Sequence, residues 1–170
     1  MRKICFVFIL LLAVGSLNAQ VYERELGVRL GYTSGFTGKV IKNNSVGIEG
    51  MLGFRQGGMQ LYVLLESYKN LMPHNEKVKW VMYFGGGGHM GWVNGYDRVR
   101  VRSGMYGNYW EEVYISGMVI GIDGVFGTEY TLPKAPISFK MEFKPFLEVQ
   151  GFQRVEANFF DFGFGINYKF

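Results

Sequence analysis

Apolar and polar residues alternate with a period of two along most of the chain after residue 20. Around residue 140, for example, Phe139 and Met141 fall on one face while Lys140 and Glu142 fall on the other. Such alternation is typical of a β-strand whose two faces meet different surroundings. It is clear in seven segments, at about 25–33, 44–55, 59–68, 77–92, 113–131, 136–148 and 157–170. The pattern predicts an all-β chain.

An eighth strand is expected between the first two of these segments. In a closed antiparallel barrel the first and last strands also pair antiparallel, so the number of strands must be even. The best candidate is the segment 36–42, because residues 33–35 and 43–45 on either side are typical of turns. The alternative is that 36–42 belongs to a loop and that the extra strand lies within 94–112.

Three details favour a transmembrane barrel over a soluble β-sandwich. The apolar faces are nearly unbroken over about ten residues, which is the length of a membrane-spanning strand. The opposite faces carry charges or glycine, as in a polar lumen. One strand has Trp80 and Trp92 at the two ends of a single face. Its 92 − 80 = 12 intervals, at ~3.3 Å each and a tilt of ~40°, span about 30 Å. We therefore predict an up-and-down antiparallel barrel of eight strands, with a soluble periplasmic β-protein as the alternative.

The first residues have the composition of a secretory signal peptide. Arg2 and Lys3 precede an apolar run, and the segment 17–19 approximates the small residues that come before a cleavage site. The run is shorter than the roughly 20 apolar residues of a membrane-spanning helix. We expect cleavage after Ala19, which leaves 20–170 as the barrel domain. Cys5 lies inside the signal, so the mature chain is expected to have no disulfide and no thiolate metal site.

Composition and charge exclude several classes of protein. The chain has 25 glycines, 15 phenylalanines, 11 tyrosines and only 4 prolines, a composition that suits strands better than helices. Without Arg2 and Lys3 the basic residues number 18 − 2 = 16 against 14 acidic ones, and they form no single basic face. Nucleic acid is therefore not an expected partner, and we expect neither a metal nor another cofactor.

The last strand carries the clearest resemblance to a known family. The segment 160–170 alternates aromatic residues with polar or small ones and ends in Tyr168, Lys169 and Phe170. It resembles the closing strand of small eight-stranded outer-membrane barrels such as OmpX and the OmpA membrane domain. A resemblance to barrels from Bacteroidota lies in the segments 83–89, 121–124 and 129–130. This resemblance implies a Gram-negative outer membrane, and a barrel-assembly machinery that recognises Tyr168 and Phe170 during biogenesis.

The inward faces of the strands predict a lumen filled by paired charges. An eight-stranded barrel has an interior only wide enough for side chains, and buried charges must be paired. The predicted network is nearly balanced, with five basic and six acidic residues. Its members are Arg29, Lys79, Lys140, Lys144, Lys169, Glu49, Glu66, Asp123, Glu129, Glu142 and Asp161. We expect a plugged barrel that does not conduct, with a small porin-like pore as the alternative. Inward Gly85, Gly87 and Gly91 are expected to make room for long side chains across the lumen.

His89 is the one candidate for catalysis. Gly85 to Gly88 superficially resemble a phosphate-binding loop, but the lysine and helix that such a loop needs do not follow. Some outer-membrane enzymes that modify lipids use a histidine at the rim of the barrel with a serine and a carboxylate. The nearby candidates for those roles are Ser103, Ser116, Asp97 and Glu112. Their spacing does not fix a triad, so we assign no catalytic residue and expect no enzyme.

The stretch 93–112 is the best candidate for a binding surface. It is long and polar and is expected to be an exposed loop on the outer side, while the turn at 133–136 is expected in the periplasm. Arginine beside aromatic residues is typical of recognition surfaces, and arginine binds phosphate groups well. The candidate residues are Arg98, Arg100, Arg102, Tyr106, Tyr109 and Trp110. We therefore expect a monomeric structural or surface-binding barrel, whose partners are outer-membrane lipid and lipopolysaccharide. The alternative is a solvated loop with interfacial aromatics.

Overall fold

A computed structural model describes residues 22–43, 45–72, 79–103, 107–151 and 154–170. Every regular element in these ranges is a β-strand. The strands are β1 (Tyr22–Gly31), β2 (Ser34–Lys42), β3 (Val46–Arg55), β4 (Gly58–Asn70), β5 (Lys79–Ser103), β6 (Gly107–Thr131), β7 (Ile137–Phe143), β8 (Phe146–Gln150), β9 (Arg154–Asn158) and β10 (Phe162–Lys169). Among the described residues, no α-helix is long and apolar enough to cross a bilayer.

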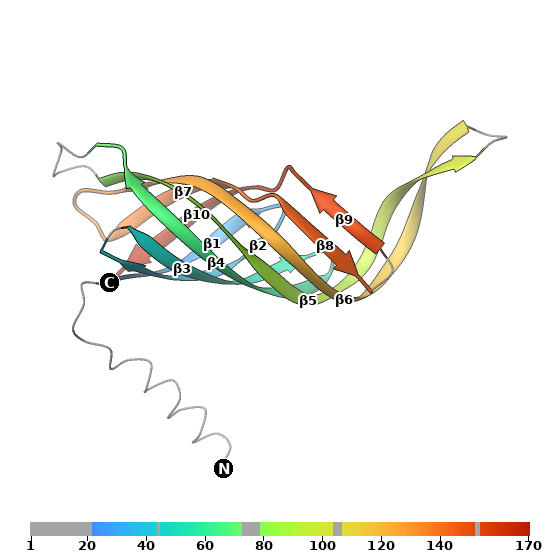
Figure 1. The fold of residues 1–170 in the computed structure, drawn as a ribbon, viewed down its shortest axis with the longest axis horizontal. Helices are drawn as coiled ribbons and strands as arrows, with labels where there is room; N and C mark the ends of the chain where they lie inside the picture. Colours follow the sequence, from blue (N-terminus) through green and yellow to red (C-terminus); the bar gives the residue numbers. More distant parts are fainter. Residues whose placement is uncertain (1–21, 44, 73–78, 104–106, 152–153) are drawn as a thin grey trace, which may run out of the picture.

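The sheet closes into an eight-stranded antiparallel barrel. Neighbouring strands follow the order β5-β4-β3-β2-β1-β10-β7-β6-β8-β9, and β5 also pairs with β6, which closes the ring (Figure 1). β7 and β8 both pair with β6 and form one interrupted strand, and β9 and β10 form another. The ten segments therefore make eight barrel strands, as the alternation predicted.

The two interruptions lie side by side. Pro145 separates β7 from β8, where a residue without an N–H can donate nothing to the ladder. Phe143 pairs with Phe162 and Phe146 pairs with Asn158, so two residues on one strand face three on the other. This extra residue is a β-bulge, which bends and twists the strand locally.

The segment 36–42 is confirmed as a strand, within β2. The expectation of a loop over 93–112 is wrong, and so is the alternative of an extra barrel strand there. β5 runs to Ser103 and β6 begins at Gly107, and the two stay paired from Lys79 and Thr131 to Ser103 and Gly107. Valine and arginine alternate over 98–102, which suits a strand. The expectation of a loop came from the polar residues of this stretch.

Past the barrel wall, β5 and β6 form an arm of two strands. The last backbone hydrogen bond between β5 and the β3–β4 turn runs from Asn94 N to Gln56 O. The last one between β6 and the end of β8 runs from Gly151 N to Met118 O. Within the described residues, 95–103 and 107–116 pair only with each other. At ~3.3 Å per residue the arm extends about 26 Å. It projects from the end of the barrel opposite the C-terminus (Figure 1).

The molecule is apolar outside and polar inside. Exposed large hydrophobic side chains occur on every one of the eight barrel strands, while the buried side chains include seventeen of Glu, Asp, Lys, Arg, Asn, Gln and His. The buried hydrophobic cluster is small and consists of Leu64, Tyr83 and Val125 with Tyr68 against it. A soluble sandwich would show the reverse distribution, because its apolar faces would pack together.

Candidate functional site

The lumen holds most of the ionic side chains that the alternation assigned to it. Nine of the eleven predicted residues are buried: Arg29, Glu49, Glu66, Asp123, Glu129, Lys140, Glu142, Lys144 and Asp161. The side chain of Lys169 is 14% exposed and that of Lys79 is 32% exposed. Lys79 pairs with Glu23 near the terminal end.

The buried charges form one unbroken series of contacts from one end of the lumen to the other. From the arm end, its order is Arg55, Glu148, His89, Asp123, Lys144, Asp161, Arg29, Glu142, Lys140, Glu49, Lys39, Glu129, Lys169 and Glu25. Each member lies within 4.0 Å of the next. Glu66 joins through Lys39, 3.1 Å from Oε2 to Nζ. Because most of these pairs join different strands, the series ties the walls of the barrel together.

Arg29 is the centre of the densest part of this network. It is fully buried and lies on β1. Its guanidinium donates to the carboxylate of Glu142, to the carbonyl oxygen of Thr33 and, over 3.0 Å, to Oδ1 of Asp161. Tyr83 donates its hydroxyl to Oε2 of the same Glu142 over 2.8 Å. The site therefore holds two carboxylates against one planar cation, the geometry to which arginine is best suited.

Aromatic rings line the network between the charges. Lys39 Nζ lies 4.6 Å from the ring centre of Tyr83, and Lys144 Nζ lies 4.0 Å from that of Tyr62. The guanidinium of Arg55 lies 4.2 Å from the ring centre of Phe146. Such cation–π contacts add to the ion pairs where water is scarce. The rings fill space that a conducting pore would leave to water.

Several members of the network were missed from the sequence. Lys39 was overlooked because its strand was the least certain, although it alternates with Phe36 and Val40 there. Arg55 and Glu25 lie at the ends of predicted strands and share the parity of Glu49 and Arg29. Glu148 likewise shares the parity of the inward residues 140–144. Applying the alternation to every position of the predicted segments would have found all of them.

The glycines that make room for these side chains differ from those expected. A Cβ at Gly163 would lie 2.5 Å from Arg29 Cζ, and one at Gly165 would lie 2.6 Å from two carbons of Lys140. A Cβ at Gly127 would meet the Tyr83 ring at 2.5 Å. At Gly85, Gly87 and Gly91 the nearest atom is instead a backbone carbonyl oxygen of β4. Long side chains therefore lie over glycines of neighbouring strands, a relation that alternation along one strand cannot show.

His89 is held between two carboxylates. Its Nδ1 lies 2.7 Å from Asp123 Oδ2 and its Nε2 lies 2.8 Å from Glu148 Oε2. Ser116 and Glu112 are exposed on β6, and the side chains of Asp97 and Ser103 lie outside the described residues. Both ring nitrogens thus already have acidic partners.

The outward surface carries aromatic side chains near both ends of the barrel. Close to the terminal end lie Trp80, Tyr130, Phe139, Tyr168 and Phe170, and close to the arm end lie Phe36, Phe54, Trp92, Phe159 and Phe160. Between them most outward side chains are aliphatic, such as Val63 and Ile122. Tyr168 and Phe170, the residues of the predicted assembly signal, are 55% and 62% exposed. The surface is an apolar band with aromatic borders.

The candidate binding residues lie on the arm. In the backbone register Arg98 is opposite Glu112, Arg100 is opposite Trp110, and Arg102 is opposite Asn108. Tyr109 pairs with Val101 in the same ladder. The side chains of Arg98, Arg100, Arg102, Tyr109 and Trp110, and all of Tyr106, lie outside the described residues.

Comparison with known proteins assigns no family to the chain. No protein-family model and no curated protein sequence matches the chain. A solved structure, the N-terminal β-barrel domain of Pseudomonas aeruginosa OprF, is similar with a TM-score of 0.46 and 13% identity. The match covers 88% of this chain and 96% of that domain.

Replacing Arg29 by methionine is predicted to destabilise the folded barrel. The change leaves Glu142 and Asp161 short of a cation inside the lumen, and breaking a buried pair typically costs about 3–5 kcal/mol. The free energy of unfolding from urea titration in detergent micelles measures the loss. Lys69→Met, at an exposed lysine of β4, is the matched control and is expected to change it by less than about 0.5 kcal/mol. Equal losses in the two variants would contradict a stabilising role for the network.

Proposed function

We propose that this chain is an outer-membrane β-barrel with a closed lumen and a structural or surface-binding role. The observation that carries the proposal is the inverted distribution of side chains, with an exposed apolar band outside and a continuous ion-pair network inside. An exposed apolar band that extends over all eight barrel strands is rare on soluble monomers. A closed barrel also leaves no strand edge to hydrocarbon, as a membrane requires.

The packing of the lumen supports a barrel that does not conduct. Arg29, Tyr62, Tyr83 and Lys144 are among the largest fully buried side chains. They bond to neighbours across the lumen rather than lining an open path. A porin needs a wide, water-filled interior, which eight strands do not provide.

The arm supports a role at the cell surface. Outer-membrane barrels have short connections on the periplasmic side and longer ones outside. The arm is the longest projection of the described chain, and we therefore place it outside and the termini in the periplasm. Arg98, Arg100 and Arg102 alternate along β5 of the arm, where we expect them to bind lipopolysaccharide phosphates. Exposed Tyr168 and Phe170 at the other end fit recognition by an assembly machinery.

The contacts of His89 do not support an enzyme. A histidine acting as a general base needs a ring nitrogen directed at a nucleophile. Here Asp123 and Glu148 bind the two ring nitrogens. We therefore favour a lumen residue that holds two carboxylates together.

The purified barrel is predicted to be silent in planar bilayers. We expect no steady ion conductance, because paired side chains occupy the lumen. A variant with Arg29, Tyr62 and Tyr83 replaced by alanine widens the lumen and is expected to conduct, which shows that the assay responds to the lumen. Stable open channels of the unaltered protein would contradict the closed lumen.

Neutralising the arginines of the arm is predicted to weaken binding to lipopolysaccharide. The variant with Arg98→Gln, Arg100→Gln and Arg102→Gln is compared with one carrying Lys42→Gln, Lys69→Gln and Lys134→Gln. These three lysines are exposed at the terminal end, so both variants lose three cations. Co-sedimentation of the detergent-solubilised proteins with lipopolysaccharide aggregates measures binding. We expect a loss only in the arm variant, and equal binding by the two variants would contradict the proposed surface.

A further inference from the structure

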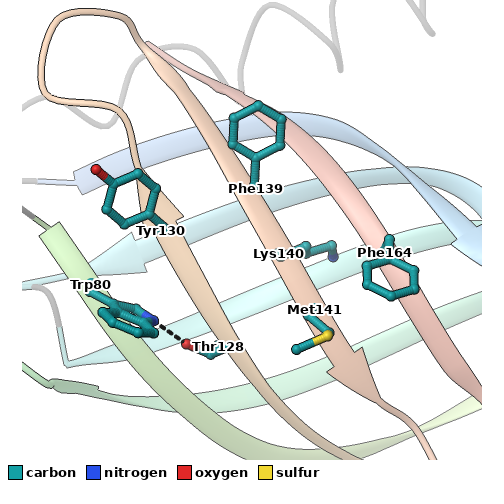
Figure 2. A pocket seen from close by; sticks show the side chains of 7 residues that line it. All are labelled: Trp80, Thr128, Tyr130, Phe139, Lys140, Met141 and Phe164. Carbon is teal, nitrogen blue, oxygen red and sulfur yellow. Dashed lines mark hydrogen bonds between the residues drawn. The ribbon is translucent and has the colours of Figure 1, made fainter.

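We propose that a groove on the outward face of β5, β6, β7 and β10 is a binding site for a single phospholipid acyl chain. This inference rests on the proposed outer-membrane function, because the membrane supplies the ligand. The groove has a volume of about 310 Å³ and is lined by Trp80, Thr128, Tyr130, Phe139, Lys140, Met141 and Phe164 (Figure 2). A second hollow of about 220 Å³ shares Thr128 and Met141 with it and continues toward Phe126, Phe143 and Phe162.

The groove exists because one outward position carries a small side chain. Thr128 pairs with Met82 on one side and with Met141 on the other. Its outward neighbours along β6 are Phe126 and Tyr130, both far larger. The threonine therefore forms a low floor between aromatic walls. Methionine is flexible and adapts its shape to what it contacts, so Met82 and Met141 suit a chain of variable conformation.

Three of the polar side chains that line the groove already have partners. Trp80 donates Nε1–H to Thr128 Oγ1 over 2.6 Å, and Thr128 donates its hydroxyl to the carbonyl oxygen of Val81 over 3.1 Å (Figure 2). Lys140 turns its ammonium into the lumen, where it pairs with Glu49 and Glu142. The lining thus offers aromatic, thioether and aliphatic surface, which fits hydrocarbon and not a polar ligand.

The position of the groove selects the kind of hydrocarbon. It starts beside Trp80 and Tyr130, whose rings meet edge-on at 6.5 Å in the aromatic border of the terminal end, and it runs toward the middle of the band. Aromatic residues at such a border lie at the level of lipid headgroups. With the termini in the periplasm, the site faces the phospholipid leaflet. A phospholipid headgroup at the border would place its acyl chain along Thr128 and Met141.

Retention of a brominated phospholipid in detergent tests this site. Bromine on an acyl chain quenches the fluorescence of a tryptophan that it contacts. The variant with Trp92→Phe and Trp110→Phe keeps only Trp80 in the groove. The variant with Trp80→Phe and Trp110→Phe keeps only Trp92, which faces outward at the other border of the same strand. Both are folded into vesicles of dibrominated phosphatidylcholine and then diluted into an excess of unbrominated detergent.

We expect the fluorescence of Trp80 to stay quenched after dilution, while the fluorescence of Trp92 recovers on mixing. Adding Thr128→Phe to the variant that keeps Trp80 fills the groove at position 128. The fluorescence of Trp80 is then expected to recover on mixing as well. Ser67→Phe, at an outward position of β4 away from the groove, is the matched control and should leave the quench in place. Equal recovery of Trp80 and Trp92 in barrels that have inserted would overturn the acyl-chain site alone. A detergent-resistant dimer that Thr128→Phe dissociates would assign the groove to a second copy and overturn it too. Failure of every variant to enter vesicles would overturn the membrane function itself.

Discussion

The structure depends on one constraint, which is that charged side chains inside a narrow barrel must find partners. Eight strands enclose too little space for bulk water, and an unpaired buried charge is costly. The chain meets this constraint with a single connected series of ion pairs and histidine hydrogen bonds from Arg55 to Glu25. The aromatic rings of Tyr62 and Tyr83, and glycines such as Gly163 beneath the long side chains, are arranged around it. The outward faces are then left for apolar residues.

The arm and the barrel wall are held by different strand pairings. Inside the wall every strand except β9 has at least two neighbours, and its register is fixed by pairs such as Glu66 with Gly85 and Asp123 with Gly87. Beyond Asn94 and Met118 the arm has only its own ladder. A lone two-stranded hairpin is marginally stable in water, so the rigid barrel beneath it provides its support. A stable scaffold that carries a less constrained projection is the usual arrangement of a recognition surface, and in the proposed membrane setting it extends from the outer leaflet.

Alternation was sufficient to predict the all-β class, the eight barrel strands and the inward positions of Lys140 and Asp161. It works because each residue has only two choices of face and the two faces differ strongly in polarity. The same reasoning was wrong for 93–112, because the many polar residues of that stretch resemble a loop when the strand has left the barrel. It also missed partners across the ring. The register and stagger of separate strands place Lys39 opposite Glu49 and Gly165 beneath Lys140. The sequence of one strand alone does not contain this information.

The most direct test of this account measures which residues of one strand face hydrocarbon. The predicted mature chain contains no cysteine, so single cysteines can be placed along β4 at 61–66 and spin-labelled in lipid vesicles. Collision rates with oxygen, which concentrates in hydrocarbon, are expected to be high at Leu61, Val63 and Leu65 and low at Tyr62, Leu64 and Glu66. A water-soluble nickel reagent should reach none of the first three. If those three were instead shielded from both reagents, and Glu66 were open to the nickel reagent, the apolar faces would form an interior and the account would be contradicted.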